Sequence, residues 1–393
     1  MTDVPSRAMS ERPATRPWSK NFPANFGAPA TWDTIVVGSG MGGMTCAALL
    51  AALGQRVLVL EQHYVPGGFT HSFKRGKYEW DVGVHAVGEV TARSMPGRLL
   101  HALSGGRLQW SSLGPVYDAF EFPDGLQLGF PDNPHAFREL LVKHFPNQVD
   151  AIDGYLGRVR DVAAAMRGYY LARLAPVGAS VFTDMFTGPA RRAFAETCGH
   201  ALDKLTEDAR LKTVLAAQWA YHGATPKRAS FAIQALVTKH FLWGGYYPVG
   251  GSASIARHLL QAVADAGGYT RISTDVSQVL LDNGRAVGVR LKDGEELRAH
   301  RVVSAAGVLS TVQRLLPREA ITIMPGELGL EGDEPLPLYT IEVDGQPRQM
   351  ALVEGGIKVG VYARPDNLEQ TYERRPTEVD PVGGFVNQEK ITV

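Results

Sequence analysis

A glycine-rich turn between two short apolar segments limits the fold of this 393-residue chain more than any other feature. Residues 34–37 are apolar enough for a short buried strand, and residues 43–53 are small and apolar enough for a helix on a sheet. Gly54 is a plausible helix stop, and residues 57–60 read as a second apolar strand. This order predicts a parallel βαβ unit with a right-handed connection.

The turn itself reads Gly38-Ser39-Gly40-Met41-Gly42-Gly43, which is the position and pattern of a dinucleotide-binding fingerprint. Gly38 permits the tight turn, Gly40 lets backbone approach a pyrophosphate, and Gly43 lets helix and strand pack closely. The N-terminus of the helix then stabilises phosphate charge. Glu61 ends the second strand at the separation expected for binding the adenosine ribose hydroxyls, and an acid there disfavours a 2′-phosphate. The alternative is a plain glycine turn with a solvated glutamate.

Composition excludes several classes of function. The 40 basic residues balance the 40 acidic ones, so the basic excess of a nucleic-acid-binding protein is missing. The two cysteines, Cys46 and Cys198, are far apart and form no CxxC pattern, and the histidines have no spacing that suggests a metal site. We therefore expect no disulfide and no metal, and a reducing cytoplasm fits this usage.

The chain ends and the apolar runs set expectations for location. The first 30 residues contain five prolines and no apolar core of a signal peptide, so they predict a flexible leader. No stretch approaches the 18 or more apolar residues of a membrane span. We expect a cytoplasmic protein whose membrane contact, if it has any, is peripheral.

Periodicity divides the rest of the chain into two parts. Strands at 116–122 and 126–130 around an Asp-Gly turn predict a hairpin, and residues 132–240 have a helical pattern. After Tyr246 a helix to Ala266 is followed by predicted strands at 276–281, 286–291, 296–299 and 302–305, the first three forming a β-meander, and a hairpin is expected between Gln349 and Tyr362. The predicted boundaries are a leader at 1–30, a nucleotide-binding domain at 31–105 with 245–317, an inserted substrate domain at 106–244 and an atypical tail at 318–393.

One helical segment carries a regular apolar stripe. Its members follow three-and-four spacing and are Ile152, Tyr155, Leu156, Val159, Val162, Ala163 and Met166. Such a stripe is most simply a core face, and the alternative is the lining of a ligand tunnel.

Residues beyond the turn extend the signal. The positions that share a wider pattern are Ala47, Leu50, Gly54, Val57, Val59, Glu61, Gly67, Gly68 and Ser72. Their spacing resembles the large FAD-binding family that includes amine oxidases and phytoene desaturases. The resemblance implies FAD as the cofactor and an α/β fold with a Rossmann-like two-dinucleotide-binding FAD domain, a β-meander and an inserted α+β substrate domain. Gly67 and Gly68 would lie where a loop runs close to the cofactor.

Three segments narrow the resemblance to the retinol saturase, carotenoid isomerase and phytoene desaturase branch. They are Gly67-Gly68-Phe-Thr-His-Ser72, Tyr78-Glu-Trp-Asp-Val-Gly-Val-His85 and Tyr246-Tyr-Pro-Val-Gly-Gly-Ser252. The resemblance implies that the second segment lies near the flavin, that the third lines the substrate side, and that the backbone of Val276 meets the adenine. The residues carried over in this way as cofactor contacts are Gly67, Gly68, Ser72, Asp81, Gly83, Gly250, Gly251 and Val276.

His85 and Tyr247 are the catalytic candidates. His85 could orient flavin or substrate, or protonate a carbanionic centre, and Tyr247 could pack against a polyene or the flavin. The simpler alternatives are a hydrogen-bonded packing histidine and a space-filling tyrosine. For Val276 the alternative is a purely structural strand residue.

The resemblance implies a flavoenzyme acting on carbon-carbon double bonds of a lipophilic polyene or isoprenoid. Reduction, desaturation and isomerisation stay open, and no second Gly-x-Gly-x-x-Gly identifies an NAD(P)H domain or the electron donor. Residues 318–393 do not match the strand and helix with which this family closes the FAD domain. The alternatives are a non-catalytic lipid- or prenyl-binding protein on the same scaffold and a truncated, inactive flavoprotein.

Overall fold

The computed structural model describes residues 16–173, 180–317, 338–343, 346–353 and 360–363. Its main element is a seven-stranded sheet in the order β1-β10-β3-β2-β13-β12-β11. The strands are β1 (Trp18–Ser19), β10 (Tyr269–Arg271), β3 (Val57–Leu60), β2 (Thr31–Val37), β13 (Glu296–Ser304), β12 (Arg285–Leu291) and β11 (Val276–Asp282). The first five are parallel to their neighbours, and the last two continue antiparallel from β13 as a meander.

Alternation of side chains explains why the central strands are apolar throughout. Val36, Val57 and Val59 belong to one buried cluster, which includes helix residues of α1 (Met41–Ala52), α2 (Met95–Leu103) and α9 (Ala253–Asp265). Leu58 and Leu60, on the alternate positions, belong to a second cluster on the opposite face. A parallel sheet covered on both faces requires such continuous hydrophobic strands.

The N-terminal segment corrects one expectation. Trp18 and Ser19 pair with β10, and Phe22 and Phe26 stack on Trp32 with ring centroids 6.0 and 6.1 Å away. The prediction of a flexible leader over residues 1–30 is therefore wrong for this part, because the aromatic side chains cover an apolar sheet face. Residues 1–15 lie outside the described residues.

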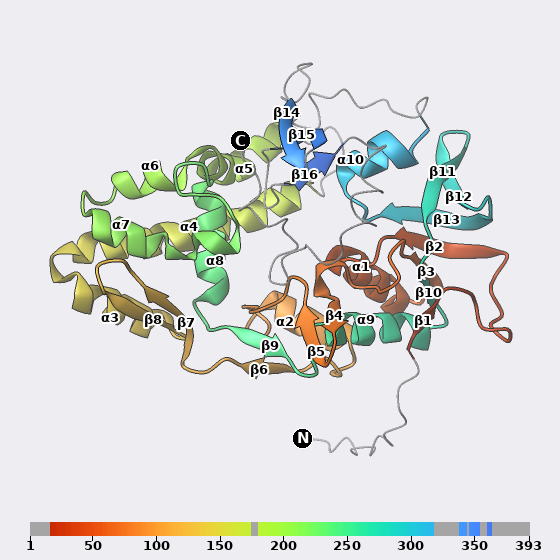
Figure 1. Ribbon diagram of the computed structural model, residues 1–393, viewed down its shortest axis with the longest axis horizontal. Helices are drawn as coiled ribbons and strands as arrows, with labels where there is room; N and C mark the ends of the chain where they lie inside the picture. The colour runs from red at the N-terminus through yellow and green to blue at the C-terminus, as the bar shows by residue number, and fades with distance from the viewer. Residues whose placement is uncertain (1–15, 174–179, 318–337, 344–345, 354–359, 364–393) are drawn as a thin grey trace, which may run out of the picture.

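A second group of elements lies to the left of the sheet in Figure 1 and is largely helical. Its elements are β7 (Val116–Glu121), β8 (Gln127–Pro131), α3 (Pro134–His144), η2 (Pro146–Gln148), α4 (Val149–Arg173), α5 (Ser180–Ala195), α6 (Cys198–Asp203), α7 (Ala209–Leu215), η3 (Ala217–Tyr221) and α8 (Phe231–Phe241). We call residues 113–245 the helical lobe and the described residues before them and from 246 to 317 the sheet lobe. The helical lobe has its own buried cluster.

The two lobes are joined where β6 (Trp110–Ser112) pairs with β9 (Tyr246–Pro248). The chain therefore leaves and re-enters the sheet lobe through one antiparallel ribbon. The predicted domain boundaries at 105/106 and 244/245 lie near these strands in the sequence, and the division into domains stays a prediction. The remaining elements are η1 (Gly68–Thr70), β4 (Ser72–Arg75), β5 (Tyr78–Asp81), α10 (Val308–Ser310), η4 (Thr311–Leu315), β14 (Leu338–Val343), β15 (Gln346–Val353) and β16 (Gly360–Ala363).

Most predicted elements are confirmed, including the βαβ unit, the 116–130 hairpin and the helix that ends before Ala266. The apolar stripe of α4 is confirmed as a core face, since Ile152, Tyr155, Val159, Val162 and Met166 are buried. The hairpin expected between Gln349 and Tyr362 corresponds to β15 and β16. One prediction is wrong: residues 296–299 and 302–305 do not form two strands, because Glu296–Ser304 is a single strand, β13, whose residues 296–298 pair with β12 and whose residues 298–304 pair with β2.

Two kinds of feature are absent from the described residues. None of the helices there is both long enough and apolar enough to cross a membrane. Within the same residues, His, Cys, Asp and Glu side chains nowhere gather in a group of three that could hold a metal ion.

Candidate functional site

The fingerprint turn is shaped by contacts that only glycine allows. Gly38 has a φ of +94°, and a Cβ there would lie 3.3 Å from the backbone of Ala305. A Cβ on Gly43 would overlap the carbonyl oxygen of Gly38, whereas a Cβ on Gly40 or Gly42 would meet nothing within 4 Å. The turn is thus closed on its inner side and open on the side of Gly40 and Gly42.

Helix α1 starts directly from this turn. Its N-cap is Gly40, which has no side chain to cap the helix, and the first turn contains no acidic residue. The first N–H groups of a helix have no intrahelical partner, and together with the helix dipole they favour an anion. Met41 follows at the open side and is 37% exposed. This geometry fits a bound phosphate.

Glu61 points back at the turn and is only 8% exposed. One carboxylate oxygen accepts the backbone N–H of Ser39 at 2.9 Å and its hydroxyl at 2.5 Å, and the other accepts the backbone N–H of His63 at 2.8 Å. A carboxylate has about four acceptor sites, so capacity for about one further donor remains. The predicted bond to ribose hydroxyls stays a prediction, with the acid in the expected place.

The Gly67-Gly68 turn closes on the fingerprint. Both residues have positive φ, and a Cβ on Gly68 would lie 3.0 Å from the Cα of Gly40. The N–H of Gly67 donates to the Ser39 hydroxyl at 3.0 Å. The two glycine turns and Glu61 therefore form one hydrogen-bonded unit around the start of α1.

Val276, predicted to meet the adenine, opens β11 and is 7% exposed. Two residues earlier, the N–H of Thr274 donates to the carbonyl oxygen of Glu61 at 2.8 Å. The meander thus begins beside the acid, although the role of Val276 is still a prediction.

The structure brings a second set of predicted residues together around Asp81. One oxygen of its carboxylate accepts the Ser252 hydroxyl at 2.5 Å, and the other accepts the Tyr247 hydroxyl. Gly250 and Gly251 both have positive φ, and a Cβ on Gly251 would lie 4.0 Å from the Tyr247 hydroxyl. Two motifs more than 160 residues apart therefore meet at one carboxylate. We call Asp81, Tyr247 and Ser252 the Asp81 cluster.

The environment of Tyr247 keeps its hydroxyl protonated. Burial raises the pKa of Tyr247 to about 12, and the neighbouring Asp81 carboxylate acts in the same direction. At neutral pH the phenol is therefore a hydrogen-bond donor. Ser252 ends the third motif segment but was not predicted as a site residue. It stands at the N-cap of α9, yet its hydroxyl makes no capping bond and donates to Asp81 instead.

Two predicted residues have local structural partners. Ser72 pairs with Asp81 across the β4–β5 hairpin, and its hydroxyl donates to Glu79 at 2.6 Å. A Cβ on Gly83 would lie 2.9 Å from the Cβ of Phe69, so glycine is needed there for packing. Both stay predictions as cofactor contacts.

His85 lies apart from the Asp81 cluster and is exposed towards the helical lobe. Its ring centroid is 5.2 Å from that of Tyr221, whose hydroxyl donates to Asp118 at 2.9 Å. Burial raises the pKa of the Asp118 carboxyl, while the bond from Tyr221 and the charge of His85 oppose this. Asp118 and Tyr221 could not be predicted from the sequence, because they are near His85 only in three dimensions.

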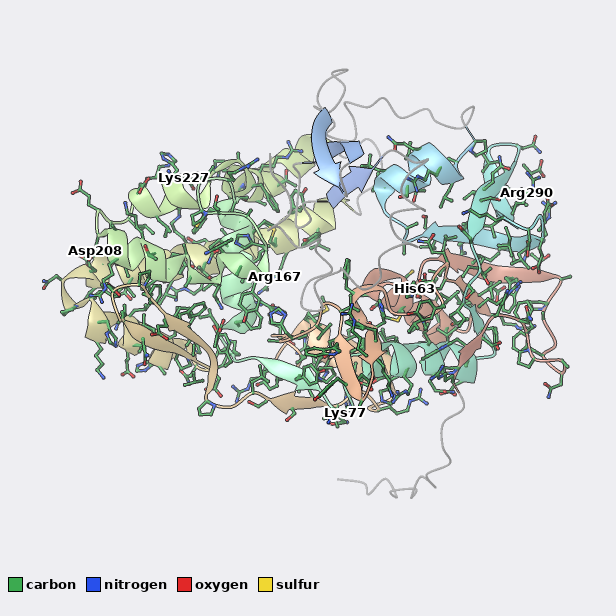
Figure 2. The ribbon with its side chains drawn as sticks, in the orientation of Figure 1. His63, Lys77, Arg167, Asp208, Lys227 and Arg290 are labelled. Carbon is green, nitrogen blue, oxygen red and sulfur yellow. The ribbon has the colours of Figure 1, made fainter. Side chains whose placement is uncertain are left out.

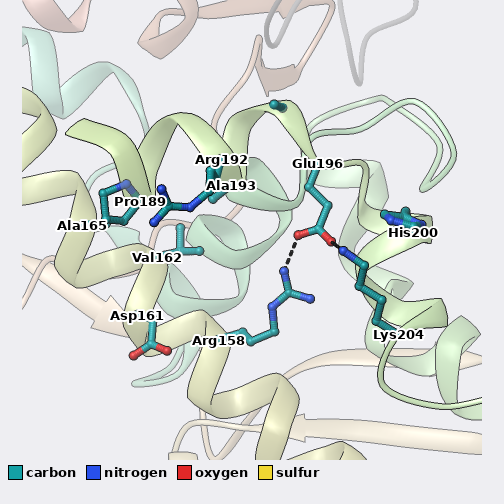
Figure 3. Close-up of a pocket in the computed structure, with 11 residues that line it drawn as sticks. Arg158, Asp161, Val162, Ala165, Pro189, Arg192, Ala193, Glu196, His200 and Lys204 are labelled. Carbon is teal, nitrogen blue, oxygen red and sulfur yellow. Dashed lines mark hydrogen bonds and ion pairs between the residues drawn. The ribbon is translucent and has the colours of Figure 1, made fainter. Parts of the chain in front are cut away.

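A cavity lies elsewhere, between α4, α5 and α6 (Figure 3). It is a groove of about 540 Å³. Glu196 in its wall accepts hydrogen bonds from Arg158 and from Lys204, the latter at 2.9 Å, so one carboxylate is shared by two cations. Val162 of the apolar stripe lines it, but none of the predicted catalytic or cofactor-binding residues does.

Known proteins resemble this chain in sequence. Residues 36–94 match the family described as an NAD(P)-binding Rossmann-like domain. The chain is 32% identical over 347 residues to all-trans-retinol 13,14-reductase of Danio rerio, covering 82% of this chain and 56% of that protein. It is 29% identical over 306 residues to the chloroplastic prolycopene isomerase of Arabidopsis thaliana, covering 75% and 51%. The chain is a homologue of retinol reductases and prolycopene isomerases.

A solved structure also supports the fold of this chain. Cyclohexylamine oxidase from Brevibacterium oxydans superposes with a TM-score of 0.50 at 20% identity, covering 74% of this chain and 62% of that one. The curated relatives confirm the resemblance seen in the motifs, and the solved structure confirms the Rossmann-like α/β fold class. The matched Rossmann-like family indicates a nucleotide as the class of cofactor. The chain spans about half the length of the curated relatives that it matches.

Proposed function

We propose that the chain is an FAD-dependent oxidoreductase that acts on carbon-carbon double bonds of a lipophilic polyene or isoprenoid. The observation that carries this proposal is the unit formed by the fingerprint turn, Glu61 and Gly67-Gly68 at the uncapped start of α1. The homologues add the substrate class, since they are named for retinol and for prolycopene.

FAD fits the residues that are present. The start of α1 would hold the diphosphate, Glu61 would hold the adenosine ribose, and the same acid disfavours the 2′-phosphate of NADP. Gly67 and Gly68 leave room for close approach, as both lack a side chain beside Gly40. When bound, the flavin supplies the hydride chemistry, and the protein supplies placement and electrostatics.

The Asp81 cluster would provide a fixed proton donor. Asp81 holds the Tyr247 hydroxyl in one orientation, and the raised pKa keeps the phenol protonated at neutral pH. Because its proton is already donated to Asp81, Tyr247 would deliver it only through exchange within the cluster. Its simplest role is to position Asp81 and the Gly250-Gly251 turn along the substrate side.

We call His85, Asp118 and Tyr221 the wall around His85. Together with Phe241, whose ring packs on that of Tyr221, this wall would meet the substrate. The rings of Tyr221 and Phe241 are 4.7 Å apart, and that of Tyr117 is 5.4 Å from Phe241. Aromatic faces with polar tips suit a conjugated apolar chain that ends in a polar group. His85 could then orient or protonate the substrate at this wall.

Loading with FAD is the first test. Purified protein incubated with FAD and desalted should absorb near 450 nm and release the flavin on denaturation. The loaded protein should then be reduced chemically under anaerobic conditions and given a panel of retinoids and carotenoids. We expect a loss or shift of the polyene chromophore with at least one of them.

Two outcomes would count against the proposal in different ways. A protein that remains colourless after incubation with FAD would contradict the cofactor assignment. A flavin-loaded protein that binds polyenes, seen as quenching of tryptophan fluorescence, and never changes their spectra would support the non-catalytic binding protein instead.

A further inference from the structure

Two histidines lie beside the fingerprint turn and have no part in the function proposed above. His63 follows Glu61 by two residues and lies in the sheet lobe (Figure 2), and His71 directly follows η1. Their ring centroids are 4.9 Å apart. His71 is bonded to Gly68, and Gly68 is the residue that packs against Gly40 at the start of α1. The imidazole of His71 is therefore connected to the anion-binding end of the helix through a single residue.

The hydrogen bond of His71 fixes which ring nitrogen carries the proton. Its Nδ1 lies 2.5 Å from the carbonyl oxygen of Gly68, and since a carbonyl only accepts, Nδ1 must donate. In the neutral ring Nε2 is then a bare acceptor, and it has no partner among the described residues. A phosphate oxygen is also an acceptor. His71 can therefore bond a phosphate only after Nε2 takes up a proton.

The surroundings leave His71 neutral before a ligand arrives. Burial lowers the pKa of His71, and His63 lowers it further, while the Gly68 carbonyl and the Glu61 carboxylate raise it. Helix α9 packs against η1. Its cationic residue Arg257 lowers the pKa of Glu79 and of His258 and is not a cause of the shift at His71. The first turn of α1 adds no acidic group. The ring is thus neutral, and an anion placed beside it would favour its protonated form.

We propose that binding of a dinucleotide diphosphate is coupled to proton uptake at Nε2 of His71, which then donates to a phosphate oxygen. This rests on the proposed dinucleotide cofactor and adds a binding residue and a pH dependence to it. The sign follows from linkage: the anion favours the charged ring, so the pKa of His71 rises on binding, and affinity increases as pH falls towards 6.

Binding of FAD and of ADP-ribose to the full chain tests this between pH 6 and pH 8. Both are diphosphate diesters whose phosphates do not titrate in this range. We expect both to bind about tenfold more tightly at pH 6 than at pH 8, as for a charge-assisted hydrogen bond gained. Calorimetry in buffers of different ionisation enthalpy should show proton uptake that averages about half a proton over this pH range, as linkage requires for a tenfold change across two pH units.

Variants assign the proton to a residue. H71N places an amide donor near the position of Nδ1, so it can keep the bond to Gly68 while losing the titrating nitrogen. We expect it to bind at every pH as weakly as the native protein at pH 8, with no proton uptake. H258N is the matched control. His258 is also half-buried with a lowered pKa, but its pKa is lowered by burial and by the charges of Arg107 and Arg257. It should bind like the native protein.

Three results would overturn the inference. They are an affinity independent of pH, proton uptake that persists in H71N, and uptake that is lost in H63N while H71N retains it. Should H71N fail to fold, the imidazole resonance of His71 in the native protein decides, since its pKa must rise when ADP-ribose is added. Absence of binding of either ligand at any pH would instead refute the proposed cofactor, and this inference with it.

Discussion

The fingerprint turn and the wall around His85 are built in opposite ways. The turn is made by backbone: glycines at 38, 43, 67 and 68 are fixed by positive φ or by close approach, and the hydrogen bonds that join Ser39 to Glu61 and Gly67 lie within one short segment, while Ala305 packs against Gly38 and Gly43. The wall is made by side chains of three distant segments, which contribute His85, Asp118 and Tyr221. The residues proposed to bind the nucleotide are thus largely recognisable within one segment of the sequence, whereas the proposed substrate side at His85 exists only once the two lobes are assembled.

The largest effect should come from adding one methyl group to the turn. In G43A the new Cβ would overlap the Gly38 carbonyl oxygen, so α1 must move away from β2. We expect a loss of about 3 kcal/mol in the free energy of unfolding, together with loss of dinucleotide binding, as for severe overpacking. Urea denaturation and FAD titration would measure both.

The neighbouring glycine provides the control. A Cβ at Gly42 meets nothing within 4 Å, and alanine is the better helix former by about 1 kcal/mol. G42A should therefore be as stable as the native protein or more so. Equal destabilisation by G42A and G43A would show that the turn tolerates no side chain at all, and the close-approach argument would fail.

An intermediate effect is expected at the Asp81 cluster, which combines both kinds of construction. In D81N one oxygen can still accept a hydroxyl, but the amide nitrogen cannot, so either Tyr247 or Ser252 loses its partner. We expect a cost of about 1 to 3 kcal/mol in unfolding free energy. The pKa of Tyr247 should fall from about 12 towards its ordinary value of 10.0. Denaturation and the phenolate absorbance give the two readings.

The pH dependence has a defined sign. Because the folded pKa of Tyr247 is raised, its contribution to stability is complete below about pH 10 and is lost as pH rises towards 12. This alkaline loss should be smaller in D81N and absent in Y247F. If D81N and Y247F each cost stability and their costs simply add in the double variant, the two side chains are not coupled and the cluster is not a unit.

These contrasts also explain what could be predicted from the sequence. The βαβ unit, Glu61 and the glycines were predictable, because each is required by geometry within a short segment. Asp81, Tyr247 and Gly251 were singled out by resemblance, yet their meeting at one carboxylate depends on the return of the chain at β9. Asp118 and Tyr221 carry no local signal, since an aspartate in a hairpin strand and a tyrosine at a helix end are ordinary there.

The smallest effect, and one of opposite sign, should come from the wall. Asp118 is half-buried and its carboxyl has a raised pKa, so ionisation at neutral pH opposes folding. D118N keeps an acceptor for the Tyr221 hydroxyl and removes the charge. We expect it to stabilise the protein by less than about 1 kcal/mol at pH 7, with the gain disappearing in acid as the native carboxyl becomes protonated. Thermal unfolding at several pH values would measure it.

Asp203 supplies the matched control for this prediction. It is an exposed aspartate whose pKa is lowered by the hydrogen bond from Lys212, so D203N should lower stability slightly at pH 7 instead of raising it. If D118N also destabilised the protein at neutral pH, the carboxylate of Asp118 would be a favourable partner of His85. The wall would then be tied to the sheet lobe by charge, and its assembly would be encoded as firmly as the turn.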